Sequence, residues 1–174
     1  MSATLRQKIE SRQAKVGVLG LGYVGLPLAT EFAKAGFEVL GFDISEHKAG
    51  QVNAGASYVG DVPTDELAEQ VRAGRLSATT DFDRLGDMDC VSICVPTPLS
   101  KTKDPDMTYV EAATNAILAR MHPDLLVILE STTYPGTTEE VLKPLLEESG
   151  LEVGKDIFLA FSPEREDPGN PDFT

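Results

Sequence analysis

Residues 16–29 read VGVLGLGYVGLPLA, and this stretch decides the fold of the chain. The run at 16–19 is apolar and of strand type, and the turn at 20–25 reads GLGYVG. Apolar residues from Leu26 to Ala33 then recur at helical spacing. A strand, a glycine-rich turn and a helix in this order form a dinucleotide-binding fingerprint.

Each glycine of the turn has a mechanical role in that fingerprint. Gly20 permits the tight turn, Gly22 lets the backbone approach a pyrophosphate, and Gly25 lets the helix lie close to the strand. The amino end of the helix then offers unpaired N–H groups and the positive end of a dipole to the phosphates. Glycine also serves turns that bind nothing, so the turn alone is weak evidence.

A second strand strengthens the interpretation. Residues 37–43 (FEVLGFD) read as a buried strand that ends in Asp43, 18 residues past Gly25. This is close to the offset of about 20 residues at which a carboxylate accepts the ribose hydroxyls of an adenosine. A carboxylate there repels a 2′-phosphate, and no arginine follows it, so the sequence favours NAD over NADP.

Two alternatives stay open around this carboxylate. Asp43 could instead cap the helix that begins near Ser45, and the two roles are compatible. Lys48, one turn into that helix, could reach the edge of the ribose, but it could equally be a solvated surface lysine.

Composition limits the class of protein and its partners. The chain has 174 residues, enough for one domain, and its 41% hydrophobic and 25% charged content is typical of a soluble globular protein. A net charge of −13 argues against nucleic acid as a partner. No apolar stretch is long enough to span a membrane, and residues 1–15 are too polar for a signal peptide, which predicts a cytoplasmic protein.

The two cysteines match no metal or redox motif. Cys90 and Cys94 lie four residues apart in a strand-like run, a spacing that no common zinc or disulfide-exchange motif uses. The sequence therefore predicts buried thiols in a reducing compartment, and no metal site.

The order of elements predicts an α/β fold. Strand patterns begin near residues 15, 38, 76, 90, 125 and 157, and helical patterns at 45–53, 63–73 and 108–121 separate most of them. This spacing indicates a doubly wound, Rossmann-type, mainly parallel sheet with helices on both faces. We expect one cofactor-binding domain over 15–174, preceded by an arm over 1–14 that is either a ragged helix or frayed.

Candidate site residues follow the carboxyl ends of the later strands, where ligands bind in such folds. The strand at 90–95 leads into Pro96-Thr97-Pro98, and Thr97 could either contact the dinucleotide or belong to a plain proline-stiffened loop. The strand at 125–129 leads into ESTTYPGTT at 130–138. There Ser131 and Thr132 suit the cleft, and Thr137 or Thr138 would cap the next helix.

The segment after the last strand and His122 each allow a functional and a structural interpretation. The last strand, at 157–161, leads into SPEREDPG at 162–169, whose charges could form part of a site or a solvated turn. His122 precedes Pro123 and is better explained as the end of a helix than as a catalyst.

Five ordered segments resemble the N-terminal, NAD-binding domain of the UDP-glucose/GDP-mannose dehydrogenase family. They are GLGYVGLP, the strand ending in Asp43, VPTPL, ESTTYPGTT and FSPERE with the PG that follows. The resemblance spans about residues 15 to 170. Within the family, TPLSKTKDPDMTYV and AFSPEREDPGN look most like the members that oxidise UDP-N-acetylhexosamines, of the UDP-N-acetylglucosamine 6-dehydrogenase type.

The resemblance implies an activity and a set of site residues. The family oxidises the C6 alcohol of a nucleotide sugar to a carboxylate with two NAD molecules per turnover. Thr132 would help hold a water or the reacting oxygen, and Glu164 would act as a general base or as the partner of that water. The cofactor would be bound by Gly20, Leu21, Gly22, Tyr23, Val24, Gly25, Asp43, Lys48, Val95, Pro96, Thr97, Ser131 and Thr132.

The sugar contacts are less completely specified by the resemblance. Glu164 and its neighbours Arg165 and Glu166 would lie along the bound sugar. The glucose-oxidising branch usually carries an aromatic residue and a leucine after that glutamate. Because Arg165 and Glu166 replace them here, the family pattern supports a sugar contact only for Glu164.

The family's catalytic cysteine has no counterpart in this sequence. In the family that cysteine forms a thiohemiacetal and then a thioester, within a glycine-rich GGxCxP-type segment of a later domain. Neither Cys90 nor Cys94 lies in such a segment. We therefore expect an isolated cofactor-binding domain that binds NAD weakly and turns over no sugar. The full-length enzyme would be a homo-oligomer that binds a UDP-sugar mostly through its other domains.

Two other functions are compatible with the glycine turn and Asp43. Another two-domain NAD dehydrogenase, such as one acting on a hydroxy acid, would share the glycine turn and Asp43 but has no need of ESTTYPGTT or SPERE. A free-standing NAD-sensing module would share the cofactor site without any chemistry.

Overall fold

The computed structural model describes residues 1–98 and 105–163. Six strands lie in one sheet: β1 (Lys15–Leu19), β2 (Glu38–Phe42), β3 (Leu76–Thr79), β4 (Cys90–Ile93), β5 (Leu126–Leu129) and β6 (Phe158–Phe161). The helices are α1 (Ala3–Glu10), α2 (Gly25–Lys34), α3 (Glu46–Asn53), α4 (Thr64–Arg72), α5 (Thr108–Leu118) and α6 (Lys143–Glu147). A 3₁₀ helix η1 (Phe82–Asp87) and a π-helical turn η2 (Thr138–Leu142) complete the described elements.

The sheet order is β3-β2-β1-β4-β5-β6, and every neighbouring pair is parallel. The prediction of a doubly wound, mainly parallel sheet is therefore confirmed. The chain leaves β1 toward β2 on one side and later adds β4 on the other side. The order thus reverses between β1 and β4, and a crevice opens there at the carboxyl ends of the strands.

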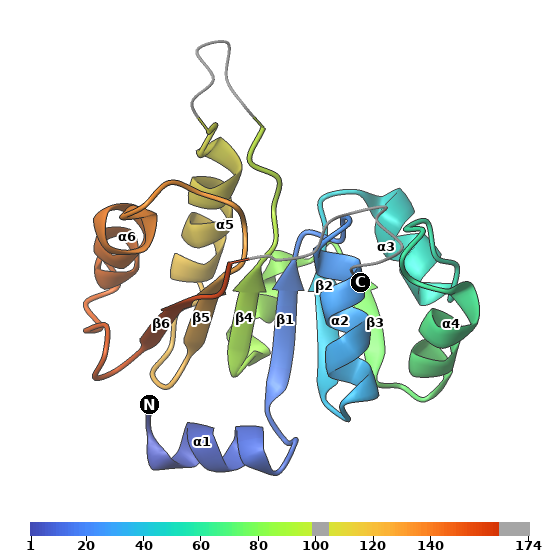
Figure 1. Cartoon of the computed structure of the whole chain (residues 1–174). Helices are drawn as coiled ribbons and strands as arrows, with labels where there is room; N and C mark the ends of the chain where they lie inside the picture. Colours follow the sequence, from blue (N-terminus) through green and yellow to red (C-terminus); the bar gives the residue numbers. More distant parts are fainter. Residues whose placement is uncertain (99–104, 164–174) are drawn as a thin grey trace.

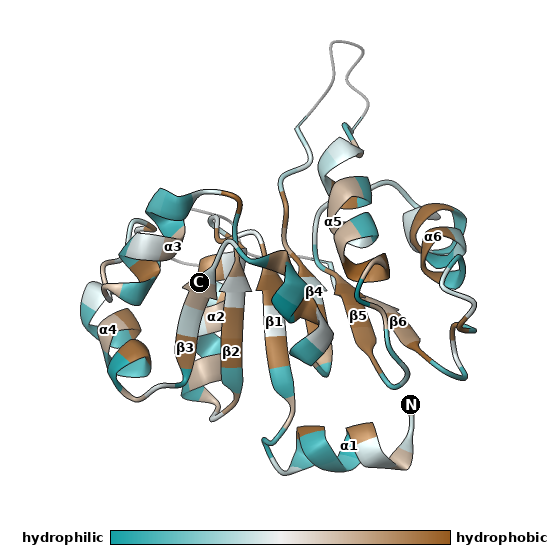
Figure 2. Cartoon of the chain, turned by 180° about the vertical axis from the view of Figure 1, so that it is seen from behind, coloured by the Kyte–Doolittle hydropathy of each residue, from teal (hydrophilic) through white to brown (hydrophobic). Residues whose placement is uncertain are grey.

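Helices cover both faces of the sheet. Helix α2 packs on the face toward the viewer in Figure 1, with α3 and α4 beside β3, whereas α5 and α6 lie behind β4–β6. Figure 2 shows the second face, where the strands are mostly hydrophobic. Burial on both faces explains why the central strands read as continuous apolar runs, for example the fully buried CVSI of β4.

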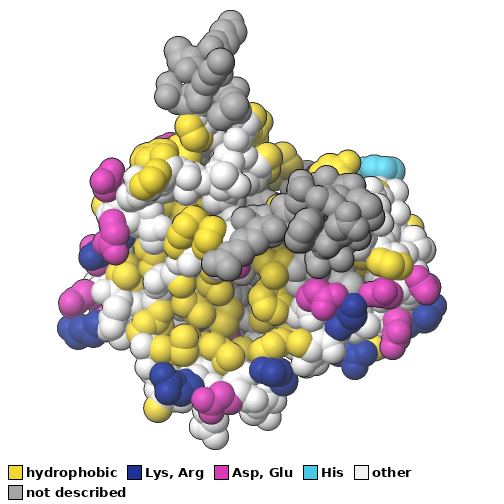
Figure 3. Space-filling model, in the orientation of Figure 1, with side chains coloured by type: hydrophobic (Ala, Val, Ile, Leu, Met, Phe, Trp, Pro, Cys, Tyr) yellow, Lys and Arg dark blue, Asp and Glu magenta, His cyan; other side chains and the backbone are white. Residues whose placement is uncertain are grey.

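The half of the sheet formed by β4–β6 carries apolar side chains on the α2 face. Figure 3 shows hydrophobic side chains gathered there, with charged side chains mainly toward the margins. Leu126 and Ile128 of β5 are partly exposed, and Ala160 of β6 is exposed.

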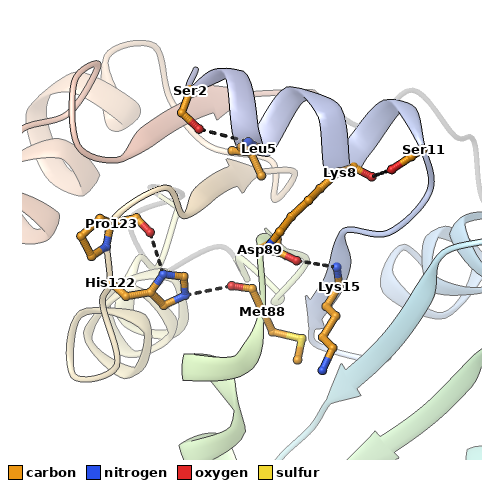
Figure 4. Close-up of polar contacts among 9 residues, drawn as sticks. All are labelled: Ser2, Leu5, Lys8, Ser11, Lys15, Met88, Asp89, His122 and Pro123. Atoms are coloured by element: carbon orange, nitrogen blue, oxygen red, sulfur yellow. Dashed lines mark hydrogen bonds and ion pairs between the residues drawn. The ribbon is translucent and has the colours of Figure 1, made fainter.

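The N-terminal segment forms an ordered helix below the amino ends of the strands. Leu5 of α1 is 1% exposed, and the Ser2 hydroxyl caps the helix by accepting a hydrogen bond from the Leu5 N–H. Lys8 Nζ lies 2.6 Å from Asp89 Oδ1, while Asp89 Oδ2 accepts the Lys15 N–H at 2.9 Å (Figure 4). The helical alternative for residues 1–14 is thus the one observed, because Leu5 joins the core.

Thr137 and His122 both lie near the ends of helices. Thr137 stands at the N-cap position of η2, as predicted, but its hydroxyl makes no capping hydrogen bond. It donates instead to the Tyr134 carbonyl at 2.7 Å, and Thr138 already belongs to η2. His122 lies at the amino-end edge of the sheet, where its ring nitrogens contact the carbonyls of Met88 and Pro123 (Figure 4). That position agrees with a helix-end role.

Candidate functional site

A pocket of about 540 Å³ lies at the carboxyl ends of β1, β2, β4 and β5, where the strand order reverses. Eleven of the thirteen residues predicted to bind the cofactor line it: Gly20, Gly22, Tyr23, Val24, Asp43, Lys48, Val95, Pro96, Thr97, Ser131 and Thr132. The remaining two, Leu21 and Gly25, belong to the same glycine turn and are buried. Sequence segments up to 112 residues apart therefore meet at one crevice.

The glycine turn is shaped by close backbone contacts. Gly20 has a φ of +89°, and a Cβ on it would lie 2.7 Å from the Cys94 carbonyl oxygen. A Cβ on Gly25 would lie only 1.8 Å from the carbonyl oxygen of Gly20. Gly22 differs, because a Cβ there would meet no atom within 4 Å. Two glycines thus serve the fold of the turn, whereas Gly22 leaves open room on the pocket side.

Helix α2 presents its amino end to this pocket. Val24, which lines the pocket, is the N-cap residue, and no side chain caps the helix there. Pro27 has no N–H, and the Leu26 N–H already donates to the Gly22 carbonyl at 3.1 Å, so the amino end of α2 contributes mainly the positive end of the helix dipole. Such an end is suited to a phosphate group.

Asp43 lies at the end of β2 and is 7% exposed. Its Oδ2 accepts the Leu21 N–H at 3.0 Å and lies 3.3 Å from Lys48 Nζ, and its Oδ1 accepts the Ser45 N–H at 3.0 Å. Ser45 itself caps α3 through its hydroxyl. Asp43 thus supports the start of α3 without being its cap, and a carboxylate with about four acceptor positions retains capacity for a ligand hydroxyl.

Tyr58 is a pocket residue that the sequence did not reveal. Its hydroxyl donates to the Leu21 carbonyl oxygen at 2.7 Å, across 37 positions of sequence. Burial, followed by the negative charge of Asp43, raises the pKa of the Tyr58 hydroxyl to about 12. Val59, Cys94 and Glu130 line the pocket as well. The only sequence signal for Tyr58 was an aromatic residue in the otherwise small, polar loop after α3.

Hydroxyl groups tie together the ends of β4 and β5. Ser131 donates to the Val95 carbonyl at 2.8 Å and approaches that of Ile93 at 3.2 Å. Thr97 donates to the Thr132 carbonyl at 2.7 Å, while the Thr132 side chain is exposed in the pocket wall. The Ser131 and Thr97 hydroxyls therefore build this wall, and the Thr132 side chain faces the open space.

A second pocket of about 380 Å³ adjoins the first beyond Asp43. The two share Gly20, Asp43, Lys48, Val95 and Pro96. The walls of the second pocket are mainly apolar, and its further lining residues are Leu19, Phe42, Ile44, Phe82, Tyr109, Ala112, Ala113 and Ala116. Ile44 is 84% exposed, so a flat apolar group could bind against it without displacing the core.

Glu164, Arg165 and Glu166 lie outside the described residues. Within the described part of the chain, no group of three or more His, Cys, Asp or Glu side chains could hold a metal ion, and no helix is long and apolar enough to cross a membrane. Cys90 and Cys94 are not joined in a disulfide, and both are buried as predicted.

The family model for the "UDP-glucose/GDP-mannose dehydrogenase family, NAD binding domain" matches residues 14–172. The chain belongs to this dehydrogenase family. Its cofactor is NAD, in agreement with the prediction from Asp43. The members of the family that resemble the chain act on nucleotide sugars, as their names state.

Individual relatives show the extent of the similarity. UDP-N-acetyl-D-glucosamine 6-dehydrogenase of Pseudomonas aeruginosa is 41% identical over 91% of this chain and 37% of its own length. UDP-N-acetyl-D-mannosamine dehydrogenase of Pyrococcus horikoshii is 40% identical over 89% of this chain and 37% of its own. The crystal structure of NDP-N-acetyl-D-galactosaminuronic acid dehydrogenase from Methanosarcina mazei Go1 matches with a TM-score of 0.85 and 37% identity, covering 97% of this chain and 38% of that one.

The chain therefore spans a little over a third of the length of the curated dehydrogenases it matches. The part of these relatives that the chain matches is the NAD-binding domain of the family.

Proposed function

We propose that this chain is the NAD-binding part of an enzyme that oxidises the C6 alcohol of a UDP-N-acetylhexosamine to a carboxylate, with two NAD molecules reduced per sugar. The chain by itself binds NAD without turning over a sugar. The observation that carries the proposal is the meeting of Gly22, Asp43, Pro96 and Thr132 in one pocket at the strand reversal. These residues come from four separate motifs that the family shares.

The residues present fit the dinucleotide. Among the described residues that line the first pocket, Lys48 is the one basic side chain, and it already pairs with Asp43. The diphosphate would therefore be held by the open backbone at Gly22 and by the amino end of α2. Asp43 would accept the adenosine ribose hydroxyls. NAD, once bound, supplies a nicotinamide ring that accepts hydride.

The two pockets give the dinucleotide a direction. The apolar second pocket beyond Asp43 suits the adenine, which would lie against Ile44. The nicotinamide then lies on the other side of the glycine turn, near Thr97 and Thr132 at the ends of β4 and β5. Thr132 would hold a water or the reacting oxygen of the sugar there. The assignments of Glu164 as base and of Arg165 and Glu166 along the sugar remain predictions from the sequence.

Calorimetry with NAD, NADP and UDP-N-acetylglucosamine tests the cofactor part of the proposal. We expect NAD to bind more tightly than NADP. Absorbance of NADH in the presence of NAD and the UDP-sugar should not rise for this chain alone. Equal binding of NAD and NADP would contradict the role of Asp43, and NADH formation would contradict the inactivity of the chain.

The substrate class is tested on an enzyme that carries this domain together with the remaining domains of its relatives. UDP-N-acetylglucosamine, UDP-N-acetylmannosamine and UDP-glucose are compared as substrates. We expect two NADH per sugar with an N-acetylated hexosamine and a lower kcat/KM with UDP-glucose. A preference for UDP-glucose would reject the N-acetylhexosamine assignment while leaving NAD binding intact.

A further inference from the structure

Leu21, in the middle of the glycine turn, is fixed from three directions. Its N–H donates to Asp43 Oδ2 at 3.0 Å, and its carbonyl accepts the Tyr58 hydroxyl at 2.7 Å. Its side chain is fully buried and fills the space over Gly41 of β2, where an added Cβ would lie 2.6 Å from Leu21 Cδ2. The turn is therefore held by β2 with the residue that follows it, and by the loop after α3.

Holding one atom of a peptide group orients the other. In a planar trans peptide the C=O and N–H point in opposite directions, and the described residues contain no cis peptide. The peptide before Leu21 illustrates this. Asp43 holds the Leu21 N–H, and the carbonyl of Gly20 on the same peptide points away from Asp43, toward Gly25, where a Cβ would be only 1.8 Å away.

The peptide after Leu21 follows the same geometry. Because the Tyr58 hydroxyl holds the Leu21 carbonyl, the N–H of Gly22 on that peptide points to the opposite side. Gly22 lines the pocket, and the space beside its Cα is open to 4 Å. A reversal of this peptide would present the Leu21 carbonyl, with its partial negative charge, in place of the N–H.

We propose that Tyr58 is a positioning residue for the cofactor: by holding the Leu21 carbonyl, it keeps the Gly22 N–H directed at the diphosphate. This inference rests on the proposed NAD site. The Tyr58 hydroxyl acts through the turn, because its hydrogen bond is to the Leu21 carbonyl. The direction of the Gly22 N–H matters because Lys48, the basic side chain among the described lining residues, already pairs with Asp43, so the diphosphate would depend on backbone N–H groups.

Tyr58→Phe tests the proposal, since it removes the hydroxyl and keeps the ring. The affinities of wild type and variant are compared for three ligands by NMR titration: NAD, ADP and adenosine. We expect NAD and ADP to bind about 3- to 10-fold more weakly to the variant, the range for one lost hydrogen bond. Adenosine, which has no phosphate, should bind equally to both proteins.

A control variant and a direct measurement complete the design. Tyr134→Phe removes the hydroxyl of a tyrosine that lines neither pocket, and it should leave all three affinities unchanged. Hydrogen exchange should accelerate at Leu21 and Gly22 in free Tyr58→Phe, with the amides in the second half of α2 unaffected. Equal weakening of adenosine, or unchanged affinity for ADP, would overturn the positioning role.

The outcome separates this inference from the proposed function. Failure of the wild-type chain to bind NAD at all would reject the proposed site, whereas normal NAD binding by both proteins rejects only the role of Tyr58. If Tyr58→Phe does not fold, Tyr58→Leu gives the same comparison, because it also removes the hydroxyl and leaves Leu21 unchanged. A selective loss of ADP affinity supports the proposal, and a loss shared by adenosine contradicts it.

Discussion

The carbonyl oxygen of Gly20 and the Cα of Gly25 face each other so closely that a Cβ on Gly25 would lie 1.8 Å from that oxygen. No L side chain fits that distance, so α2 can begin at this point only with glycine. The amino end of α2 is thereby placed directly against the end of β1. This contact fixes where the helix dipole points.

Gly25 and Gly22 should respond differently to the same substitution. Gly25→Ala forces α2 away from the turn, so we expect both a lower free energy of unfolding and weaker NAD binding. Gly22→Ala meets no protein atom within 4 Å, so its stability should stay close to that of the wild type. Its added methyl takes the room beside the diphosphate, and NAD affinity should fall at least about tenfold. Urea unfolding and calorimetry measure the two effects, and a stable Gly25→Ala with normal NAD affinity would contradict this account.

Asp43 should control the choice between NAD and NADP. Asp43→Asn removes the charge that repels a 2′-phosphate and weakens the acceptor for the ribose hydroxyls. We expect NAD to bind about tenfold more weakly, as for loss of a charged hydrogen bond, and the preference for NAD over NADP to narrow. Asp61→Asn removes the same charge from an exposed loop position and serves as the control. An unchanged NAD-to-NADP ratio in Asp43→Asn would show that another residue sets the selectivity.

The Tyr58 hydroxyl should make stability depend on pH in the alkaline range. Its pKa is about 12 in the folded protein and about 10 in an unfolded chain, so the folded state favours the neutral form. The stabilisation is complete below pH 10 and is lost as the pH rises from 10 to 12. Urea unfolding at several pH values should show that the advantage of wild type over Tyr58→Phe shrinks in this window.

A second group titrates in the same range and must be separated from Tyr58. Burial, and then the charge of Asp89, raises the pKa of the Cys90 thiol to about 11. Because Cys90 is present in both proteins, its contribution cancels in the difference between wild type and Tyr58→Phe. Tyr134→Phe should run parallel to wild type throughout. A constant difference between wild type and Tyr58→Phe from pH 9 to 12 would contradict the raised pKa of the Tyr58 hydroxyl.

Helix α1 should contribute to stability and leave cofactor binding unaffected. Leu5 is 1% exposed and joins the core at the amino-end edge of the sheet, opposite the pocket (Figure 1). Leu5→Ala should lower the free energy of unfolding by about 2–5 kcal/mol. Arg6→Ala, on the exposed side of α1, should change it by no more than about 0.5 kcal/mol. NAD affinity should be the same in both variants at a temperature where each is folded, and a selective loss in Leu5→Ala would show coupling between the two edges.

The sequence determined the elements and most of the pocket, because each of these depends on short-range patterns. The periodicities around 16–42 and the alternation of strands and helices already predicted the parallel sheet. In such a sheet the strand ends meet at one edge, so Gly22, Asp43, Thr97 and Thr132 could be assigned to one site without coordinates.

Tertiary structure alone decided the contacts that hold this site in shape. The bond from Tyr58 to Leu21 joins residues 37 positions apart, and the loop that carries Tyr58 has no periodic pattern to announce its path. The same holds for α1, whose few apolar residues predict a helix poorly until Leu5 enters the core, and for Thr137, whose hydroxyl turns back to Tyr134. Local pattern encodes which face of an element is buried, whereas the partner of a single polar group depends on how the whole chain packs.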